Sequence, residues 1–147
     1  MKIVNGIIQE KEIFGLKVKI DIVEPKGIKN VRTLRKMEPC GITVHNTGNS
    51  GKGAGDESHS AYIQNVENND NDYVSWHLTV DADSVTQHIP LNEMAYHAGD
   101  GSGFGNTRTI GIEIAEPIDQ KYSMCEDNAL KVIVWLMMQY NFSIDDV

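Results

Sequence analysis

Hydrophobic and polar residues alternate in five short segments of the chain, and this period of two is typical of half-buried β-strands. The segments are 14–23, 40–45, 75–80, 85–89 and 109–115. In segment 75–80 the alternation places Trp76 with the apolar residues and His77 on the opposite face, and Glu113 lies opposite three isoleucines in the last segment. The short stretch 81–83, with the sequence DAD, separates two of the segments, so we expect a tight hairpin there.

Two further segments show the spacing of an amphipathic helix. Asp56 can cap the first helix, and residues 68–72 are expected to end it. The second, 125–140, carries apolar residues at helical spacing, and Asn141 is a suitable terminator. We expect this helix to cover the apolar face of the sheet. Strands interleaved with such helices predict an α/β fold, with a mixed central β-sheet flanked by helices in a single domain.

The chain divides into a less regular N-terminal part and a part with a sharper pattern. Residues 1–38 are expected to form an N-terminal strand and connector that belong to the same domain as residues 39–147. The basic stretch 26–36 could be a nucleic-acid patch, although a solvated loop or helix face is the commoner role. The chain has 13 basic and 21 acidic residues and a net charge of −8, which argues against a nucleic-acid partner.

Length and composition set further limits. A chain of 147 residues with 40% hydrophobic residues can bury one core, and no apolar run approaches the roughly 20 residues that a membrane helix needs. Cys40 and Cys125 form no CxxC pair, so we expect two reduced, buried thiols. The N-terminus is too interrupted for a secretory signal peptide. These features predict a soluble globular domain.

Three of the expected strands place a chemically capable residue opposite their apolar side chains: His45, His77 and Glu113. If the strands share one sheet, these residues face one shallow cleft, and Gly111 leaves room there for a ligand. A strand imidazole beside a partly desolvated carboxylate suits a metal-assisted hydrolase, with one metal ligand and one base. The same residues could instead be ordinary core or surface residues, and their spacing alone does not decide between the two interpretations.

The glycine-rich stretch 97–106 resembles a phosphate loop only superficially, since it lacks the lysine and leads into an expected strand instead of a helix. We interpret it as a flexible rim of the cleft. His97 and Asn106 could donate hydrogen bonds to a substrate from this rim, and its glycines let backbone N–H groups approach a peptide or a sugar.

Six motifs together resemble the zinc-dependent N-acetylmuramoyl-L-alanine amidases of the phage-lysozyme and peptidoglycan-recognition type. They are ITVHNT (42–47), SWHLTVD (75–81), QHIP (87–90), AYHAGDG (95–101), GN (105–106) and IGIEI (110–114). The resemblance runs from about residue 39 to the end, in the family's order. It implies a zinc-bearing groove that binds bacterial peptidoglycan and hydrolyses the amide between the lactyl group of N-acetylmuramic acid and L-alanine.

The resemblance also implies residue roles. His45 matches the first zinc ligand and Glu113 the catalytic carboxylate, while His77 and His97 lie in motifs that line the groove. Trp76 stands where relatives carry an aromatic residue, often Tyr, and its indole lacks a phenolic hydroxyl.

The family pattern continues after the last helix with a second histidine ligand and then a cysteine or aspartate ligand, and this chain stops at Val147, where that segment would begin. The expectation is a catalytic domain cut short, which binds zinc weakly, hydrolyses peptidoglycan poorly and self-associates through apolar surface near the last helix. The resemblance fits a phage or prophage endolysin made in the cytoplasm, with a bacterial autolysin as the alternative. Two other hypotheses stay open: a non-catalytic muropeptide-binding module and a structural or interaction domain.

Overall fold

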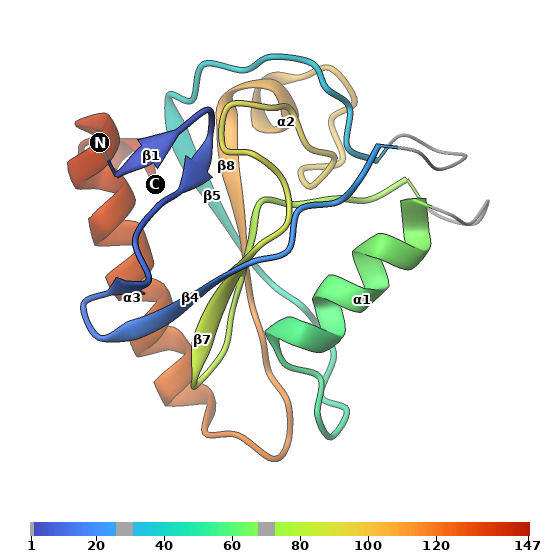
Figure 1. The fold of residues 1–147 in the computed structure, drawn as a ribbon, viewed down its shortest axis with the longest axis vertical. Helices are drawn as coiled ribbons and strands as arrows, with labels where there is room; N and C mark the ends of the chain where they lie inside the picture. The colour runs from blue at the N-terminus through green and yellow to red at the C-terminus, as the bar shows by residue number, and fades with distance from the viewer. Residues whose placement is uncertain (1, 26–30, 68–72) are drawn as a thin grey trace.

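A six-stranded mixed sheet forms the centre of the molecule in the computed structural model, which describes residues 2–25, 31–67 and 73–147 (Figure 1). The strand order is β3-β4-β7-β6-β8-β5. The bounds are β3 Glu12–Ile13, β4 Leu16–Ile20, β7 Ser84–Gln87, β6 Leu78–Val80, β8 Thr109–Ile114 and β5 Gly41–Asn46. The pairs β4·β7, β6·β8 and β5·β8 are parallel, whereas β3·β4 and the hairpin β6·β7 are antiparallel. The predicted α/β class, the mixed sheet and the hairpin are therefore confirmed.

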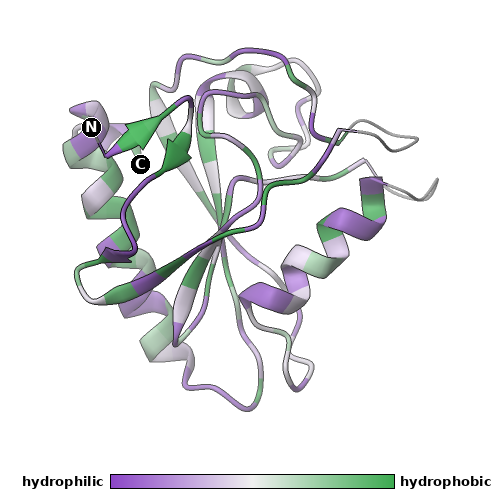
Figure 2. Ribbon diagram, viewed as in Figure 1, coloured by the Kyte–Doolittle hydropathy of each residue, from purple (hydrophilic) through white to green (hydrophobic). Residues whose placement is uncertain are grey.

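Helices cover both faces of this sheet (Figure 1). Helix α3 (Tyr122–Tyr140) packs on the face where the isoleucines of β8 lie, and the larger apolar core fills the space between them. Helix α1 (Asp56–Glu67) lies over the other face, above a smaller cluster that includes Trp76. Figure 2 shows more hydrophobic residues on α3 than on α1. The prediction that the last helix covers the apolar face is confirmed, and Asn141 ends that helix in a left-handed conformation with φ 57°.

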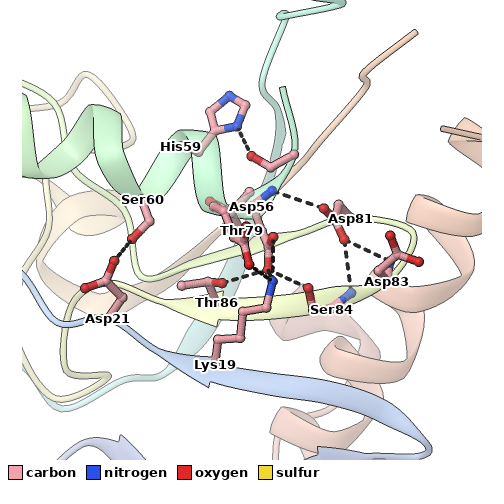
Figure 3. A network of polar contacts seen from close by, with 12 residues as sticks. Lys19, Asp21, Asp56, His59, Ser60, Thr79, Asp81, Asp83, Ser84 and Thr86 are labelled. Carbon is pink, nitrogen blue, oxygen red and sulfur yellow. Dashed lines mark hydrogen bonds and ion pairs between the residues drawn. The ribbon is translucent and has the colours of Figure 1, made fainter. Parts of the chain in front are cut away.

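A buried polar network attaches the first turn of α1 to the sheet (Figure 3). The carboxylate of Asp56 accepts hydrogen bonds from Ser84 Oγ at 2.8 Å and Thr86 Oγ1 at 2.7 Å, and Lys19 Nζ lies 3.3 Å from it. The backbone N–H of Asp56 in turn donates to the carboxylate of Asp81 at 3.2 Å. These hydrogen bonds give the buried carboxylate of Asp56 the partners that a polar group needs in the interior. They also attach the first residue of α1 to the sheet.

Several short elements differ from the sequence-based expectations. Residues 3–8 form a separate hairpin of β1 (Ile3–Val4) and β2 (Ile7–Ile8), and η1 (Ile144–Asp146) follows α3. A five-residue helix, α2 (Phe104–Arg108), separates the glycine-rich stretch from β8, so the prediction that this stretch leads directly into a strand was wrong. The reason is the carboxylate of Asp100, which accepts the N–H groups of Gly105 and Asn106 and stabilises the first turn.

The structure corrects one expectation about the cysteines. Both cysteines are free thiols, but only Cys125 is buried, and the expectation of burial was wrong for Cys40, which is half-exposed. Within the described ranges, no helix is long and apolar enough to cross a membrane. The expected end of the first helix at 68–72 lies outside the described residues, as does part of the basic stretch, 26–30.

Candidate active site

His45 and Glu113 lie side by side on the face of the sheet that α1 covers. Strands β5 and β8 run parallel, and their register places His45 directly opposite Glu113. On the other side of Glu113 the register of β6 places Thr79. Because side chains alternate along a strand, the isoleucines of β8 point to α3 while Glu113 points the other way. The hypothesis that His45 and Glu113 share one face is confirmed.

The environment of Glu113 makes its carboxyl group suitable for proton transfer. The side chain is half-buried, and its Oε2 atom is buried without a hydrogen-bond partner among the described residues. Burial, together with the nearby charge of Glu116, raises the pKa of Glu113 to about 7. A carboxyl group with a pKa near neutrality can both accept and release a proton at pH 7.

His97 contacts His45 beside this carboxylate. The Nδ1 atom of His97 lies 3.2 Å from Nε2 of His45, and Nε2 of His97 lies 3.3 Å from the carbonyl oxygen of Thr109. A carbonyl oxygen only accepts, so Nε2 of His97 carries the proton and its Nδ1 lone pair faces His45. Gly111 makes this position possible, because a Cβ atom there would lie 2.6 Å from His97 Cγ.

Both of these imidazoles are neutral at pH 7. Burial, and then the proximity of His45, lower the pKa of His97 to about 4. Burial also lowers the pKa of His45. A neutral imidazole has a free lone pair on one ring nitrogen, which is the form that binds a metal ion or accepts a hydrogen bond.

The structure corrects the predicted placement of His77. This side chain is fully buried, its Nε2 donates to the carbonyl oxygen of Glu93 at 2.8 Å, and its Nδ1 accepts from the N–H of Gly111 at 2.9 Å. Burial lowers the pKa of His77 to about 3. Because both ring nitrogens are used, His77 holds the chain beside β8 instead of lining a groove.

Asn106 also differs from the prediction. Only 1% of the residue is exposed, and its Oδ1 atom accepts the N–H groups of His97 and Ala98 at 2.8 and 2.7 Å. Its Nδ2 atom donates to the carbonyl oxygen of Gly101 at 3.0 Å. Asn106 therefore fixes the loop that carries His97, and it is too buried to donate to a substrate.

A cavity of about 370 Å³ opens next to Glu113, between α1 and the approach to β6. It is lined by Thr47, Asn49, Ser58, His59, Tyr62, Val74, Trp76 and Glu113. Trp76 lies here because the alternation of segment 75–80 breaks before β6, which starts at Leu78. The expectation that Trp76 shares a face with Leu78 was wrong, since the indole packs on the α1 side and its Nε1 donates to Thr79 Oγ1 at 2.7 Å.

Helix α1 contributes His59 and Tyr62 to this cavity. The sequence pattern places Tyr62 among the apolar positions of the first helix, with Ile63 and Val66, and it does not indicate His59 as a site residue. A signal is present, because residues three apart lie on the same side of a helix, so His59 can be grouped with Tyr62.

The described residues fit a zinc ion only in part. A catalytic zinc normally has three protein ligands. His45 and His97 offer two converging ring nitrogens, but in the described part of the chain no group of three or more His, Cys, Asp or Glu side chains is arranged to hold a metal.

Comparison with known proteins identifies the class to which this fold and site belong. Residues 35–147 match the family model of the N-acetylmuramoyl-L-alanine amidases, Amidase_2. The chain belongs to this family.

Two amidases of Bacillus subtilis (strain 168) are among its relatives. N-acetylmuramoyl-L-alanine amidase XlyA is 43% identical over 123 residues, which are 84% of this chain and 40% of XlyA. CwlH is 41% identical over 112 residues, 76% of this chain and 43% of CwlH. The chain thus spans less than half the length of these relatives. The solved catalytic domain of XlyA superimposes with a TM-score of 0.82 at 39% identity, covering 90% of this chain and 82% of that one.

Proposed function

We propose that this chain is the catalytic domain of a peptidoglycan hydrolase, which cleaves the amide between the lactyl group of N-acetylmuramic acid and L-alanine. One observation carries the proposal: Glu113 lies directly opposite His45 in a fold similar to the catalytic domain of XlyA, its pKa is about 7, and its buried Oε2 atom has no hydrogen-bond partner in the described part of the chain. The partner would be bacterial cell wall, and the biological role that of an endolysin in phage lysis or of an autolysin.

Glu113 would carry the proton through the reaction. As a carboxylate it would take a proton from a water molecule while the water oxygen bonds to the amide carbonyl carbon, which gives a tetrahedral intermediate. It would then give that proton to the amide nitrogen as the C–N bond breaks, releasing the lactyl carboxylate and the free amine of L-alanine. A pKa near neutrality suits both steps, because the group must accept a proton and then lose it.

Substitution of Glu113 tests this assignment. We expect Glu113→Gln to lower the release of new L-alanine amino groups from purified cell walls by at least about 100-fold, since removal of a general base has effects of this size. Glu126→Gln, on the exposed side of α3, is the matched control and should hydrolyse cell walls like the parent chain. Equal turnover by Glu113→Gln and the parent would contradict the proposal.

The resemblance implies zinc, and we propose that His45 is one of its ligands. When bound, zinc supplies a Lewis acid and lowers the pKa of a bound water to about 7. The described residues do not complete a three-ligand set for this metal. We expect the 147-residue chain to bind zinc weakly in a calorimetric titration and His45→Ala to abolish that binding. Metal analysis that finds one tightly held zinc per chain would contradict this prediction.

A second candidate function is a muropeptide-binding module that does not cleave its ligand. It is favoured by the incomplete set of metal donors within residues 2–25, 31–67 and 73–147. This module would bind muropeptide equally well with and without a chelator, and Glu113→Gln would not change its affinity. A hydrolase that depends on Glu113 and on a metal ion would lose cell-wall cleavage both in the presence of the chelator and in Glu113→Gln.

A further inference from the structure

His97 is held beside His45 at two places. Its backbone N–H, with that of Ala98, donates to Asn106 Oδ1 at 2.8 and 2.7 Å, which fixes the loop. Its ring is fixed separately, because Nε2 lies 3.3 Å from the carbonyl oxygen of Thr109. Since both the backbone and the ring are attached, His97 presents its Nδ1 atom to His45 in one orientation.

Two threonine hydroxyls fix the residue that accepts from the ring of His97. Thr109 Oγ1 donates to the carbonyl oxygen of Gly105 at 2.7 Å. A hydroxyl has one proton, so the contact of 2.7 Å between Thr109 Oγ1 and Thr43 Oγ1 has Thr43 as its donor. Thr43 precedes His45 by two residues on the same face of β5, so this hydrogen bond joins β5 to β8 on the side of the sheet where the histidines lie.

The contact between the two imidazoles has a direction. Because Nε2 of His97 carries its proton, Nδ1 of His97 can only accept, and Nε2 of His45 at 3.2 Å is the donor. A neutral imidazole has one ring proton, so Nδ1 of His45 holds a lone pair. This atom has no hydrogen-bond partner among the described residues, and it is not among the fully buried atoms there.

The same separation would also suit two nitrogens that bind one zinc ion, since tetrahedral zinc–nitrogen bonds of about 2.0–2.1 Å leave such nitrogens roughly 3.3 Å apart. The second ring nitrogen of His45 distinguishes the two interpretations. A histidine that binds a metal almost always donates its other ring N–H to an acceptor. If Nε2 of His45 bound the metal, its Nδ1 proton would have no acceptor in the described part of the chain. If Nδ1 binds it, His97 is the acceptor for the Nε2 proton.

We propose that His97 is a positioning residue for His45. Its Nδ1 atom accepts the Nε2 proton of His45, which orients this imidazole and leaves Nδ1 of His45 as the atom open to a metal ion. His97 then contributes no metal ligand, because its own lone pair is used. The inference rests on the proposed function only for the metal, since the hydrogen bond between the histidines belongs to the chain itself.

Two substitutions of His97 have nearly the same shape and differ in the acceptor. In His97→Asn, the Oδ1 atom lies close to the position of Nδ1 and can accept from His45. His97→Leu places a methyl group there, which cannot accept. Ser102→Ala, at an exposed position of the same loop, is the matched control. Thermal melting of each variant checks that the fold is intact.

The experiment is nitrogen NMR of the metal-free, ¹⁵N-labelled 147-residue chain at pH 7, followed by a titration with zinc. A scalar coupling between Nε2 of His45 and Nδ1 of His97 detects the hydrogen bond directly, and the exchange of its proton with water measures the protection. The ring shifts show which nitrogen binds zinc, and calorimetry gives the affinity. A purely structural role of His97 would change none of these signals in a variant that stays folded.

We expect the coupling in the parent chain and in Ser102→Ala, and a zinc-induced shift at Nδ1 of His45 while its Nε2 proton is retained. In His97→Leu, the coupling is lost. We expect the Nε2 proton of His45 to exchange about tenfold faster in this variant and zinc to bind about tenfold more weakly. His97→Asn should recover part of both losses.

The inference is overturned if the parent chain shows no coupling, if zinc displaces the Nε2 proton of His45 and shifts Nδ1 of His97, or if His97→Asn resembles His97→Leu. A coupling that persists while zinc shifts neither histidine would support the hydrogen bond and contradict His45 as a zinc ligand. Cell-wall hydrolysis is not among these measurements, so a chain that shows the coupling but cleaves no cell wall would contradict the proposed function alone.

Discussion

Surroundings decide what each ionisable residue in this site can do. Glu113 and Glu126 have the same carboxyl group, but only Glu113 is half-buried beside a histidine with an oxygen that has no partner among the described residues. His45 and His77 likewise differ, because one has a ring nitrogen facing a second imidazole and the other uses both nitrogens in the interior. Residue type alone does not separate these cases.

The raised pKa of Glu113 predicts a stability that falls with pH. The folded protein holds this proton up to a pH of about 7, while an unfolded glutamate loses it near 4.5, so the free energy of unfolding decreases between these values. Glu113→Gln removes the free-energy cost of keeping this carboxyl group protonated in the folded state as the pH rises. We expect the variant to gain about 1–2 kcal/mol over the parent between pH 4.5 and 7.5, after allowance for solvent exposure, as measured by urea denaturation. A gain that does not change with pH would contradict the prediction.

Gly111 offers a way to move His97 without changing it. We expect Gly111→Ala to push the imidazole away from His45, since the added Cβ would meet its ring, and to destabilise the protein by about 1–3 kcal/mol. Urea denaturation measures the loss of stability, and the ring resonances of both histidines in NMR spectra report their separation. Unchanged resonances in a stable variant would show that the contact does not need the space at Gly111.

The sequence could predict His45 and Glu113 as neighbours but not the accessibility of the other site residues. Because side chains alternate with a period of two, the sequence shows on which face of the sheet each strand residue lies. The patterns of two strands are enough to assign His45 and Glu113 to the same face. His77 is held in the interior by Glu93 and Gly111, which are distant in sequence, whereas Asn106 is enclosed by the preceding loop, whose path the alternation pattern does not show. Their hydrogen-bonding partners are backbone groups, which leave no trace in a pattern of side chains.

At the scale of elements, the first turn of α1 fixes the position of this helix, which forms one wall of the cavity beside Glu113. Asp56, which is 2% exposed, receives Lys19 and two strand hydroxyls, while Glu57 contacts the same lysine from an exposed position. We expect Asp56→Ala to destabilise the protein by about 3 kcal/mol, because it leaves the two buried hydroxyls of Ser84 and Thr86 without their acceptor and removes one of the two carboxylates that contact Lys19. Glu57→Gln is the control, and its loss should be clearly smaller, because water screens an ion pair at this exposed position. Chemical denaturation measures both, and equal losses would contradict the prediction.

Long elements with a clear period were predictable, and short ones were not. The core strands and both long helices bury a continuous apolar face, which the alternation or the helical spacing displays. The strands β1, β2 and β3 have two residues each, too few to show a period. Helix α2 depends on one capping carboxylate at Asp100 in a glycine-rich stretch, where propensity alone favours a loop.

At the scale of the whole molecule, α3 exposes a row of apolar side chains on its outer side. Leu130, Val134 and Met138 are spaced one turn apart and are 59%, 46% and 67% exposed. We expect the chain to self-associate weakly, with an apparent mass in sedimentation that rises with concentration and with salt, because salt screens the net charge of −8. Leu130→Glu should reduce the association, whereas Ile118→Glu, outside this row, should not. A monomer at high concentration would contradict the prediction.

His45 lies on β5, the last strand of the sheet, and among the described strands β5 pairs with β8 alone. Strands at an edge fray more easily than central ones, because half of their backbone groups have no neighbouring strand. Fraying of β5 would separate the imidazole from the glutamate while the other five strands stay paired. Activity would then be lost on heating by local fraying, at a temperature below the melting temperature of the whole domain. A ligand bound along this edge would slow the loss of activity more than it would raise the melting temperature.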